Sequence, residues 1–236
     1  MFIVDAQSHI WGADTRERPW PARTKPHREI PFGKDDLLRE MDAAGVDRVV
    51  IVPPSWEGDR NDLALAAAQA HPDRLAVMGR LDTDQPEARS AIAGWRLQPG
   101  MLGLRFTFHT PLLAPLLTDG RMDWVWRDAQ TAGVPIMVYL PQALLPHVDR
   151  IAERYPELKL VIDHLALPYL KKDEEAFAAF DMLLPLAKRP NVAVKASTLP
   201  SHTSDAYPYR RVHSYLRRVY DSFGPKRIFW ATDLTA

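Results

Sequence analysis

The sequence contains no cysteine. This absence excludes disulfide bonds, a thiolate nucleophile and metal centres held by thiolates. An excess of either charge is missing too, because 30 Lys and Arg residues are balanced by 30 Asp and Glu residues. Proteins that bind nucleic acid through a generally basic surface need extra Lys and Arg to neutralise phosphates, so we expect no nucleic-acid partner.

Long apolar runs are equally absent. No stretch reaches the roughly 18 apolar residues of a membrane span, so no membrane partner is expected. The N-terminus, MFIVDAQSHIW, lacks the basic start and apolar stretch of a secretory signal, which favours a soluble cytoplasmic protein. Neither GxGxxG nor GxxxxGK followed by Ser or Thr occurs, which removes the main support for a dinucleotide or P-loop site.

The sequence instead alternates short β-branched runs with amphipathic segments, and 46% hydrophobic residues over 236 positions are enough for a large core. The predicted strands are Phe2–His9, Arg48–Val52, Leu75–Leu81, Leu102–Phe108, Pro135–Leu140, Leu160–His164, Val192–Ala196 and Arg227–Thr232. The predicted helices are Lys34–Ala44, Asn61–Ala70 with Asn61 as N-cap, Trp124–Ala132, Ala143–Tyr155, Ala176–Leu186 and Tyr209–Phe223. Eight repeats without a composition break predict an α/β fold, a single (β/α)₈ TIM-type barrel domain over residues 1–236.

The end of the chain departs from this repeat. The eighth predicted strand leads into Asp233, and the sequence stops at Ala236. An apolar sheet face has to be covered, and no residues remain for an outer helix. We therefore expect a barrel that lacks its last outer helix, through truncation after the eighth strand. The alternative is a neighbouring chain that covers the strand, as in a homo-oligomer.

Polar side chains stand at the ends of the predicted strands, where barrels of this type place their functional groups. The first strand ends Asp5-Ala6-Gln7-Ser8-His9, and its two-residue period puts Asp5, Gln7 and His9 on one face. Arg105 and Lys195 are candidates for binding a carboxylate or polarising an oxygen. The other candidates at strand ends are Tyr139, His164 and Asp233. From the residues alone we predict a polar pocket in which a His/Asp pair activates water.

Each candidate also has a structural interpretation. Asp233 is a residue type that caps helices, and His9 and His164 fit hydrogen-bonded core histidines. Gln7 fits an interior amide bound to polar neighbours. Arg105 and Lys195 fit charges paired with interior carboxylates, and Tyr139 fits the core as well as a contact to a substrate hydroxyl.

Taken together, the strand-end motifs resemble those of the amidohydrolase-related barrel family, in its branch of lactonases and aromatic-degradation hydrolases. The matching pieces are Asp5-Ala6-Gln7-Ser8-His9-Ile10-Trp11 for the family's D-x-H-x-H motif, Gly103-Leu104-Arg105, Asp163-His164-Leu165 and Ala231-Thr232-Asp233. The resemblance implies a hydrolase that opens a lactone or a similar cyclic ester. In that role Asp233 takes a proton from water, and His9 and His164 orient the water and stabilise the oxyanion.

The resemblance also implies a small-molecule substrate, a carboxylated or sugar-derived lactone. The expected substrate-binding residues are Gln7, Arg105, Tyr139 and Lys195, with Arg105 anchoring a substrate carboxylate.

Two departures from the family bear on metal binding. Gln7 replaces the first His of the D-x-H-x-H motif, and Tyr139 stands where metal-dependent members place a His. An amide is a poor zinc ligand compared with imidazole, so we predict that no cofactor is required. The alternative is a metal-dependent hydrolase or decarboxylase on the same barrel, with zinc or manganese held by His9, His164 and Asp233. A further alternative is a non-catalytic ligand-binding barrel or an inactive truncated product.

Overall fold

The structure, a computed structural model, describes residues 1–20 and 30–234. Its strands follow one another in the sheet in chain order, and the pairs β1–β2, β2–β3, β3–β4, β5–β6 and β6–β7 run parallel. They are β1 (Val4–Ser8), β2 (Arg48–Ile51), β3 (Leu75–Gly79), β4 (Met101–Thr107), β5 (Ile136–Tyr139), β6 (Leu160–Ile162), β7 (Val192–Ser197) and β8 (Ile228–Ala231). The ends of every strand lie within two residues of the predicted ends, and the predicted (β/α)₈ fold class is confirmed.

Helices separate the strands along the chain. They are α1 (Lys34–Ala44), α2 (Asp62–Ala70), α3 (Ala88–Ala93), α4 (Ala114–Thr118), α5 (Asp123–Ala132), α6 (Leu145–Arg154), α7 (Asp173–Phe177) and α8 (Arg210–Phe223). Short 3₁₀ turns supplement them, among them η1 (Ser55–Glu57), η5 (Phe180–Met182) and η6 (Leu184–Lys188). No helix in the described ranges combines the length and apolarity needed to cross a membrane.

The chain divides into two compact units. Unit 1 comprises Met1–Arg105 and Ala231–Ala236, and unit 2 comprises Phe106–Trp230. The prediction of a single domain over the whole chain stays a prediction. The prediction about the end of the chain concerns residues beyond Leu234, which lie outside the described part.

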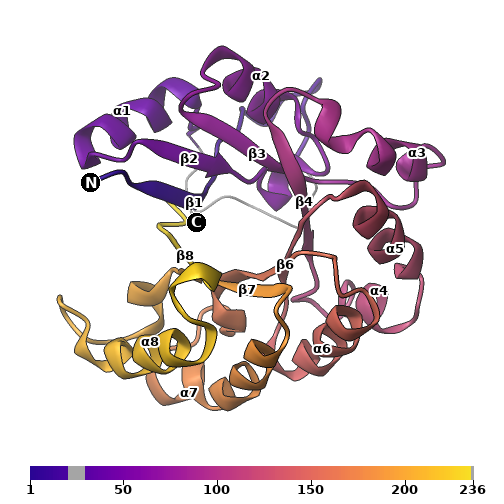
Figure 1. The fold of residues 1–236 in the computed structure, drawn as a ribbon. Helices are drawn as coiled ribbons and strands as arrows, with labels where there is room; N and C mark the ends of the chain where they lie inside the picture. Colours follow the sequence, from indigo (N-terminus) through magenta and orange to yellow (C-terminus); the bar gives the residue numbers. More distant parts are fainter. Residues whose placement is uncertain (21–29, 235–236) are drawn as a thin grey trace. The chain divides into compact units, whose positions relative to one another are not determined.

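Unit 1 holds β1 to β3 and most of β4. Pairing runs from Asp5↔Val49 through Val49↔Leu75, and Gly79 pairs with Leu104. The helices α1 and α2 lie on the same side of these strands (Figure 1). Helix α1 buries Leu37 and Met41 and ends at Gly45, whose φ of 69° suits a residue without a Cβ.

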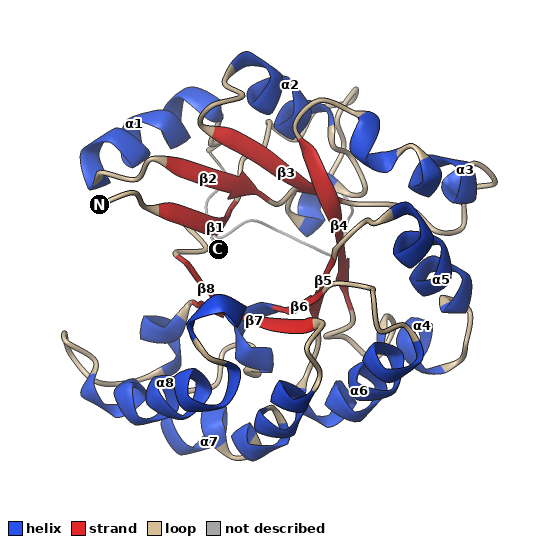
Figure 2. Cartoon of the chain, viewed as in Figure 1, coloured by secondary structure: helices blue, strands red, loops and turns tan. Residues whose placement is uncertain are grey.

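Unit 2 holds β5 to β7, paired in register as Ile136↔Leu160 and Leu160↔Val192. In Figure 2 the helices α6, α7 and α8 lie along one side of these strands. Trp126 of α5 packs its ring 6.3 Å from Phe106 and 6.4 Å from Phe108, measured between centroids. These contacts form part of the unit's apolar core.

Two helix predictions are corrected. The predicted helix Ala176–Leu186 is broken into α7, η5 and η6. Pro185 prevents a continuous α-helix through residues 181–186, because its ring lacks a backbone N–H and clashes with the preceding turn of an α-helix, and it lies in the first turn of η6. Asn61 does precede α2, but its side chain makes no capping bond and binds the backbone of Arg80 instead.

Candidate active site

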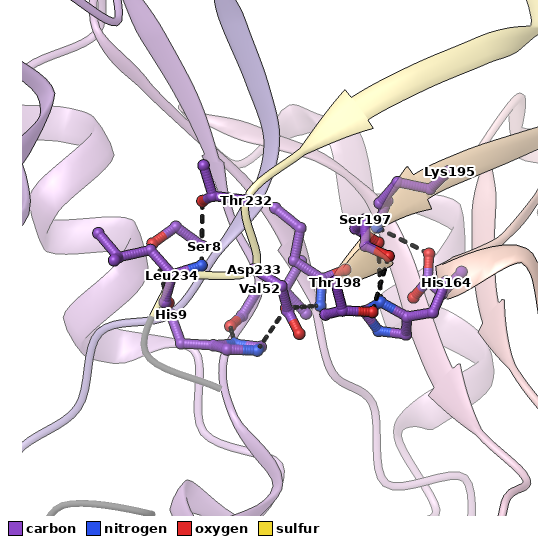
Figure 3. A network of polar contacts seen from close by, with 12 residues as sticks. Ser8, His9, Val52, His164, Lys195, Ser197, Thr198, Thr232, Asp233 and Leu234 are labelled. Atoms are coloured by element: carbon purple, nitrogen blue, oxygen red, sulfur yellow. Dashed lines mark hydrogen bonds and ion pairs between the residues drawn. The ribbon is translucent and has the colours of Figure 1, made fainter. Parts of the chain in front are cut away.

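The first cluster of polar side chains lies in unit 1, where β1 ends. Two contacts fix the ring of His9: Nδ1 lies 2.6 Å from the carbonyl oxygen of Val52, and Nε2 lies 3.1 Å from Oδ1 of Asp233 (Figure 3). A carbonyl oxygen only accepts, so Nδ1 carries a hydrogen. A second proton must therefore lie between Nε2 and the carboxylate for that contact to be a hydrogen bond.

Gln7 completes this arrangement. Its side-chain amide donates a hydrogen bond to Oδ1 of Asp233, the same oxygen that faces His9. Gln7, His9 and Asp233 are all buried. These three predicted site residues contact one another within unit 1, and their chemical roles stay predictions.

Asp5 supports the same cluster from the middle of β1. Its Oδ1 accepts hydrogen bonds from the backbone N–H groups of Gln7 (2.9 Å) and Thr232 (3.0 Å), and its Oδ2 accepts one from the hydroxyl of Thr232. Burial raises the pKa of Asp5 above its usual value. These bonds tie β1 to the segment that carries Asp233.

Asp233 has a left-handed backbone, with a φ of 56°. Such a conformation is uncommon for a residue with a Cβ and persists where the surroundings enforce it. Here the backbone N–H of Asp233 donates to the carbonyl oxygen of Gln7 at 3.0 Å, and Ser8 forms a parallel bridge with Leu234. The strained residue is therefore held in place by β1 from both sides.

Aromatic rings flank His9 in unit 1. Trp56 of η1 lies 6.1 Å from the His9 ring, and Trp11 meets Trp56 edge-on at 5.4 Å, measured between centroids. The buried Glu57 beside Trp56 accepts hydrogen bonds from the backbone of Gly12 and from the Arg18 guanidinium. The bonds from Gly12 and Arg18 to Glu57 therefore hold the loop after β1 against the turn after β2.

Two arginines stand on neighbouring strands of unit 1. Arg105 on β4 is buried, as expected for one of the predicted site residues. Arg80, which directly follows β3, was not among the site residues selected from the sequence. The available signal was its position, because it ends a predicted strand just as the selected residues do.

The second cluster lies in unit 2. His164, directly after β6, has its Nδ1 2.8 Å from the hydroxyl oxygen of Ser197 on β7. Its ring meets Tyr139 of β5 edge-on at 4.9 Å, and Tyr139 stacks on His109 at 4.9 Å. His164 and Leu165 both have a φ of 53°, so this turn is also strained.

Lys195 is fully buried in unit 2. Its ammonium lies 2.7 Å from Oδ1 of Asp163, which is equally buried, and 3.2 Å from the sulfur of Met137 (Figure 3 labels Lys195). The ion pair accounts for the charge of Lys195, as in the structural interpretation. The substrate-binding role expected for Lys195 stays a prediction.

The donor set of unit 1 bears on metal binding. Within residues 1–20 and 30–234, no group of three or more His, Asp and Glu side chains is arranged to hold a metal ion. The strand-end groups of unit 1 are one imidazole, one carboxylate and one amide, and Gln7 turns its N–H toward Asp233. A catalytic zinc site needs three nitrogen, sulfur or carboxylate ligands, and this set supplies two of them, His9 and Asp233.

Fold and strand-end residues together define a hydrolase built on a (β/α)₈ scaffold. The chain belongs to the amidohydrolase family, whose model matches residues 4–234. A curated relative, the L-fucono-1,5-lactonase of Burkholderia ambifaria, is 31% identical over 242 residues, which cover 98% of this chain and 80% of that protein. The 4-sulfomuconolactone hydrolase of Hydrogenophaga intermedia is 23% identical and covers 97% of this chain and 73% of its own length.

Solved structures show the same fold. Two crystal structures of an amidohydrolase from Burkholderia multivorans, one with bound HEPES and one with bound zinc, match with TM-scores of 0.81 and 0.79. They are 23% and 22% identical to this chain, and the matches cover 99% of it and 85% and 84% of the solved chains. A relative of this fold can therefore carry zinc.

Proposed function

We propose that this protein opens a lactone by hydrolysis, with Asp233 as the general base. The observation that carries the proposal is the meeting of Gln7, His9 and Asp233 at the end of β1. The similarity to two lactone hydrolases supports the choice of a cyclic ester.

The chemistry follows from the hydrogen bonds of Asp233. Gln7 and His9 both face Oδ1 of Asp233 and hold its carboxylate in place, and this carboxylate accepts the proton of the attacking water. The hydroxide adds to the lactone carbonyl, and the ring oxygen leaves once it receives that proton. His9, held in one orientation by the carbonyl oxygen of Val52, stabilises the negative charge that develops on the lactone carbonyl oxygen.

The other predicted roles remain part of the proposal. Arg105 is proposed to bind substrate within unit 1. His164, Tyr139 and Lys195 belong to unit 2, and their participation in the same reaction stays a prediction. A cytoplasmic location and a homo-oligomeric state likewise stay predictions, which cell fractionation and light scattering would test.

Metal-independent hydrolysis is the version we propose, because an amide stands at position 7 and donates to Asp233. The alternative is a metal-dependent hydrolase or decarboxylase, which the zinc-bound relative supports. Elemental analysis of protein purified without added metal or chelator separates the two. Activity that persists after prolonged dialysis against a chelator supports the metal-independent reaction, and activity restored only by zinc or manganese contradicts it.

The test of the function itself is a panel of lactones. Sugar lactones and dicarboxylate-derived lactones are added to the protein, and acid release is followed at constant pH. Acceleration above the uncatalysed rate that disappears in Asp233→Asn supports the proposal. If no lactone in the panel reacts faster than in buffer, the proposal is wrong.

A further inference from the structure

Arg80 carries buried donors that the protein does not use. Its side chain is 13% exposed, and its Nε and Nη1 are buried without a hydrogen-bond partner. A buried donor left without an acceptor costs free energy, and the cost is larger for a charged group. Native structures rarely keep such donors unless the site has a task.

The nearest carboxylate does not satisfy these donors. Oδ1 of Asp59 lies 3.4 Å from Nε of Arg80, which is long for an ion pair, and the Asp59 side chain is 47% exposed. A carboxylate that stays in water gains little from an ion pair. Asp59 therefore balances the charge of Arg80 only in part.

A second positive charge stands beside Arg80. Gly79 pairs with Leu104 across β3 and β4, Arg80 and Arg105 are the residues that follow these two, and the charge of Arg105 acts on Arg80. Adjacent parallel strands lie about 4.8 Å apart. Burial, and to a lesser extent the charge of Arg105, lower the pKa of Arg80 to about 10. The positive charge of Arg105 adds to that of Arg80, and the two together favour an anion beside Arg80.

The backbone of Arg80 is held in place for this role. The side chain of Asn61 donates to its carbonyl oxygen and accepts from its N–H, both at 2.8 Å. Gly79 permits this clamp, because a Cβ there would lie 2.9 Å from Oδ1 of Asn61 and 2.7 Å from Cε of Met101. Both polar atoms of the Asn61 side chain therefore bind the backbone of Arg80 and fix its position at the end of β3.

The position of Arg80 within unit 1 relates it to the reaction. Parallel strands bring their carboxyl ends to one edge of a sheet, and barrel enzymes act at that edge. Arg80 follows β3 at the edge where His9 follows β1 and where Arg105 lies near the end of β4. A planar carboxylate matches the fork of a guanidinium with two parallel hydrogen bonds.

We propose that Arg80, together with Arg105, forms an anion subsite that binds a carboxylate carried by the lactone substrate. This inference rests on the proposed function and narrows it from lactones in general to anionic ones. Arg80 is a specificity-determining residue in this scheme, and Asn61 is its positioning residue.

The experiment compares a neutral aldonolactone with the matching aldarolactone, which differs by one carboxylate. In Arg80→Met, the KM for the anionic lactone is expected to rise by about 10- to 100-fold, the usual worth of a hydrogen bond to a charged group. The KM for the neutral lactone should change by less than about threefold, because the lost donors do not touch it. Arg39→Met is the matched control, since Arg39 is exposed on α1 and pairs only with surface carboxylates.

Thermal unfolding separates this role from a structural one. Arg80→Met removes unpaired buried donors, so its melting temperature without ligand should equal or exceed that of the wild type. A clear fall in melting temperature would assign Arg80 to the architecture of unit 1 and overturn the subsite. Arg80→Lys keeps the charge and loses the fork, and it should show an intermediate KM for the anionic lactone.

Binding of glutarate, measured by calorimetry, tests the subsite without turnover. Wild-type protein should bind glutarate at least about tenfold more tightly than Arg80→Met. If no lactone is hydrolysed but this difference is found, the proposed function fails and the anion subsite stands. If lactones are hydrolysed and Arg80→Met treats the neutral and anionic substrates as the wild type does, the subsite is wrong and the function stands.

Discussion

In unit 1, the carboxylates at the strand ends meet neutral or titratable donors, whereas in unit 2 the buried carboxylate of Asp163 meets the fixed charge of Lys195. Asp233 accepts from an amide and contacts an imidazole, and Asp5 accepts only from uncharged groups. Asp163 and Lys195 form a fully buried ion pair at 2.7 Å. The groups that contact Asp5 and the amide and imidazole that contact Asp233 carry no fixed positive charge, so protons can move in the first arrangement. The second arrangement fixes its protons and serves to hold β6 and β7 together.

The largest expected effect follows from this difference. Asp233→Asn keeps the shape of the side chain and removes its basicity, so kcat should fall by about 10²–10⁴-fold with little change in KM. Steady-state kinetics on the lactone that reacts best gives both values. Melting temperature serves as the control, since an isosteric amide should leave the fold intact. Unchanged turnover would remove Asp233 from the mechanism.

The corresponding change in unit 2 should act on stability. Lys195→Met leaves the Asp163 carboxylate buried without its cation, which typically costs about 3–5 kcal/mol. Urea unfolding measures the loss. The double variant Asp163→Asn/Lys195→Met removes both charges and should recover much of it, because replacing a whole buried pair is often nearly neutral. A double variant no more stable than Lys195→Met would show that the charge pair is not the source of the loss.

Sequence patterns predicted the strands well because their signal is local. Short β-branched runs bounded by turns locate each strand, and Lys34–Ala44 appears as predicted because a glycine ends it. Asn61 stands at the predicted N-cap position of α2, but its side chain does not cap the helix, because it binds the backbone of Arg80, 19 residues away. The spacing of residues along the sequence gives no indication of a hydrogen bond between positions so far apart.

The candidate site shows the same limit. Its residues were predictable by type and by strand end, since Gln7, His9 and Asp233 all fall there. Which oxygen of Asp233 meets which donor depends on side-chain geometry. The sequence could not single out Arg80. What distinguishes it is that two of its buried N–H donors have no hydrogen-bond acceptor, and this can be seen only in the three-dimensional structure.

A smaller effect, on the stability of unit 1, is expected when Asp5 is replaced. Asp5→Ala leaves the N–H groups of Gln7 and Thr232 without their acceptor, at a cost of about 1–3 kcal/mol. Asp5→Asn keeps an acceptor oxygen and should lose less. The raised pKa of Asp5 means that the folded protein binds its proton at higher pH than the unfolded chain. Its contribution to stability is therefore present at low pH and is lost as pH rises through the folded-state pKa.

Chemical denaturation of wild type and Asp5→Asn across the acidic range checks that sign. The wild type should gain stability relative to the variant as pH falls toward 3.8, the ordinary pKa of an aspartate. The opposite trend would mean that the hydrogen bonds from Thr232 and Gln7 outweigh burial.

The smallest expected effect is a pH dependence of opposite sign in unit 2. His202 is buried, with Nδ1 3.0 Å from the carbonyl oxygen of Lys171. Burial lowers the pKa of His202 below its ordinary value of 6.5, and the Lys171 carbonyl opposes this only in part. Below pH 6.5 the unfolded chain therefore takes up a proton that the folded protein does not, and stability falls as pH falls toward the folded-state pKa.

His202→Gln isolates this contribution, because an amide keeps a donor for Lys171 and does not titrate. Free energies of unfolding at pH 7.5 and pH 5.5 should differ more for the wild type than for His202→Gln, since the other histidines are the same in both proteins and their contributions cancel. Asp5→Asn and His202→Gln should thus shift the pH profile of stability in opposite directions. If both variants shift it the same way, one of the two directions is wrong: either burial does not lower the pKa of His202, or it does not raise the pKa of Asp5.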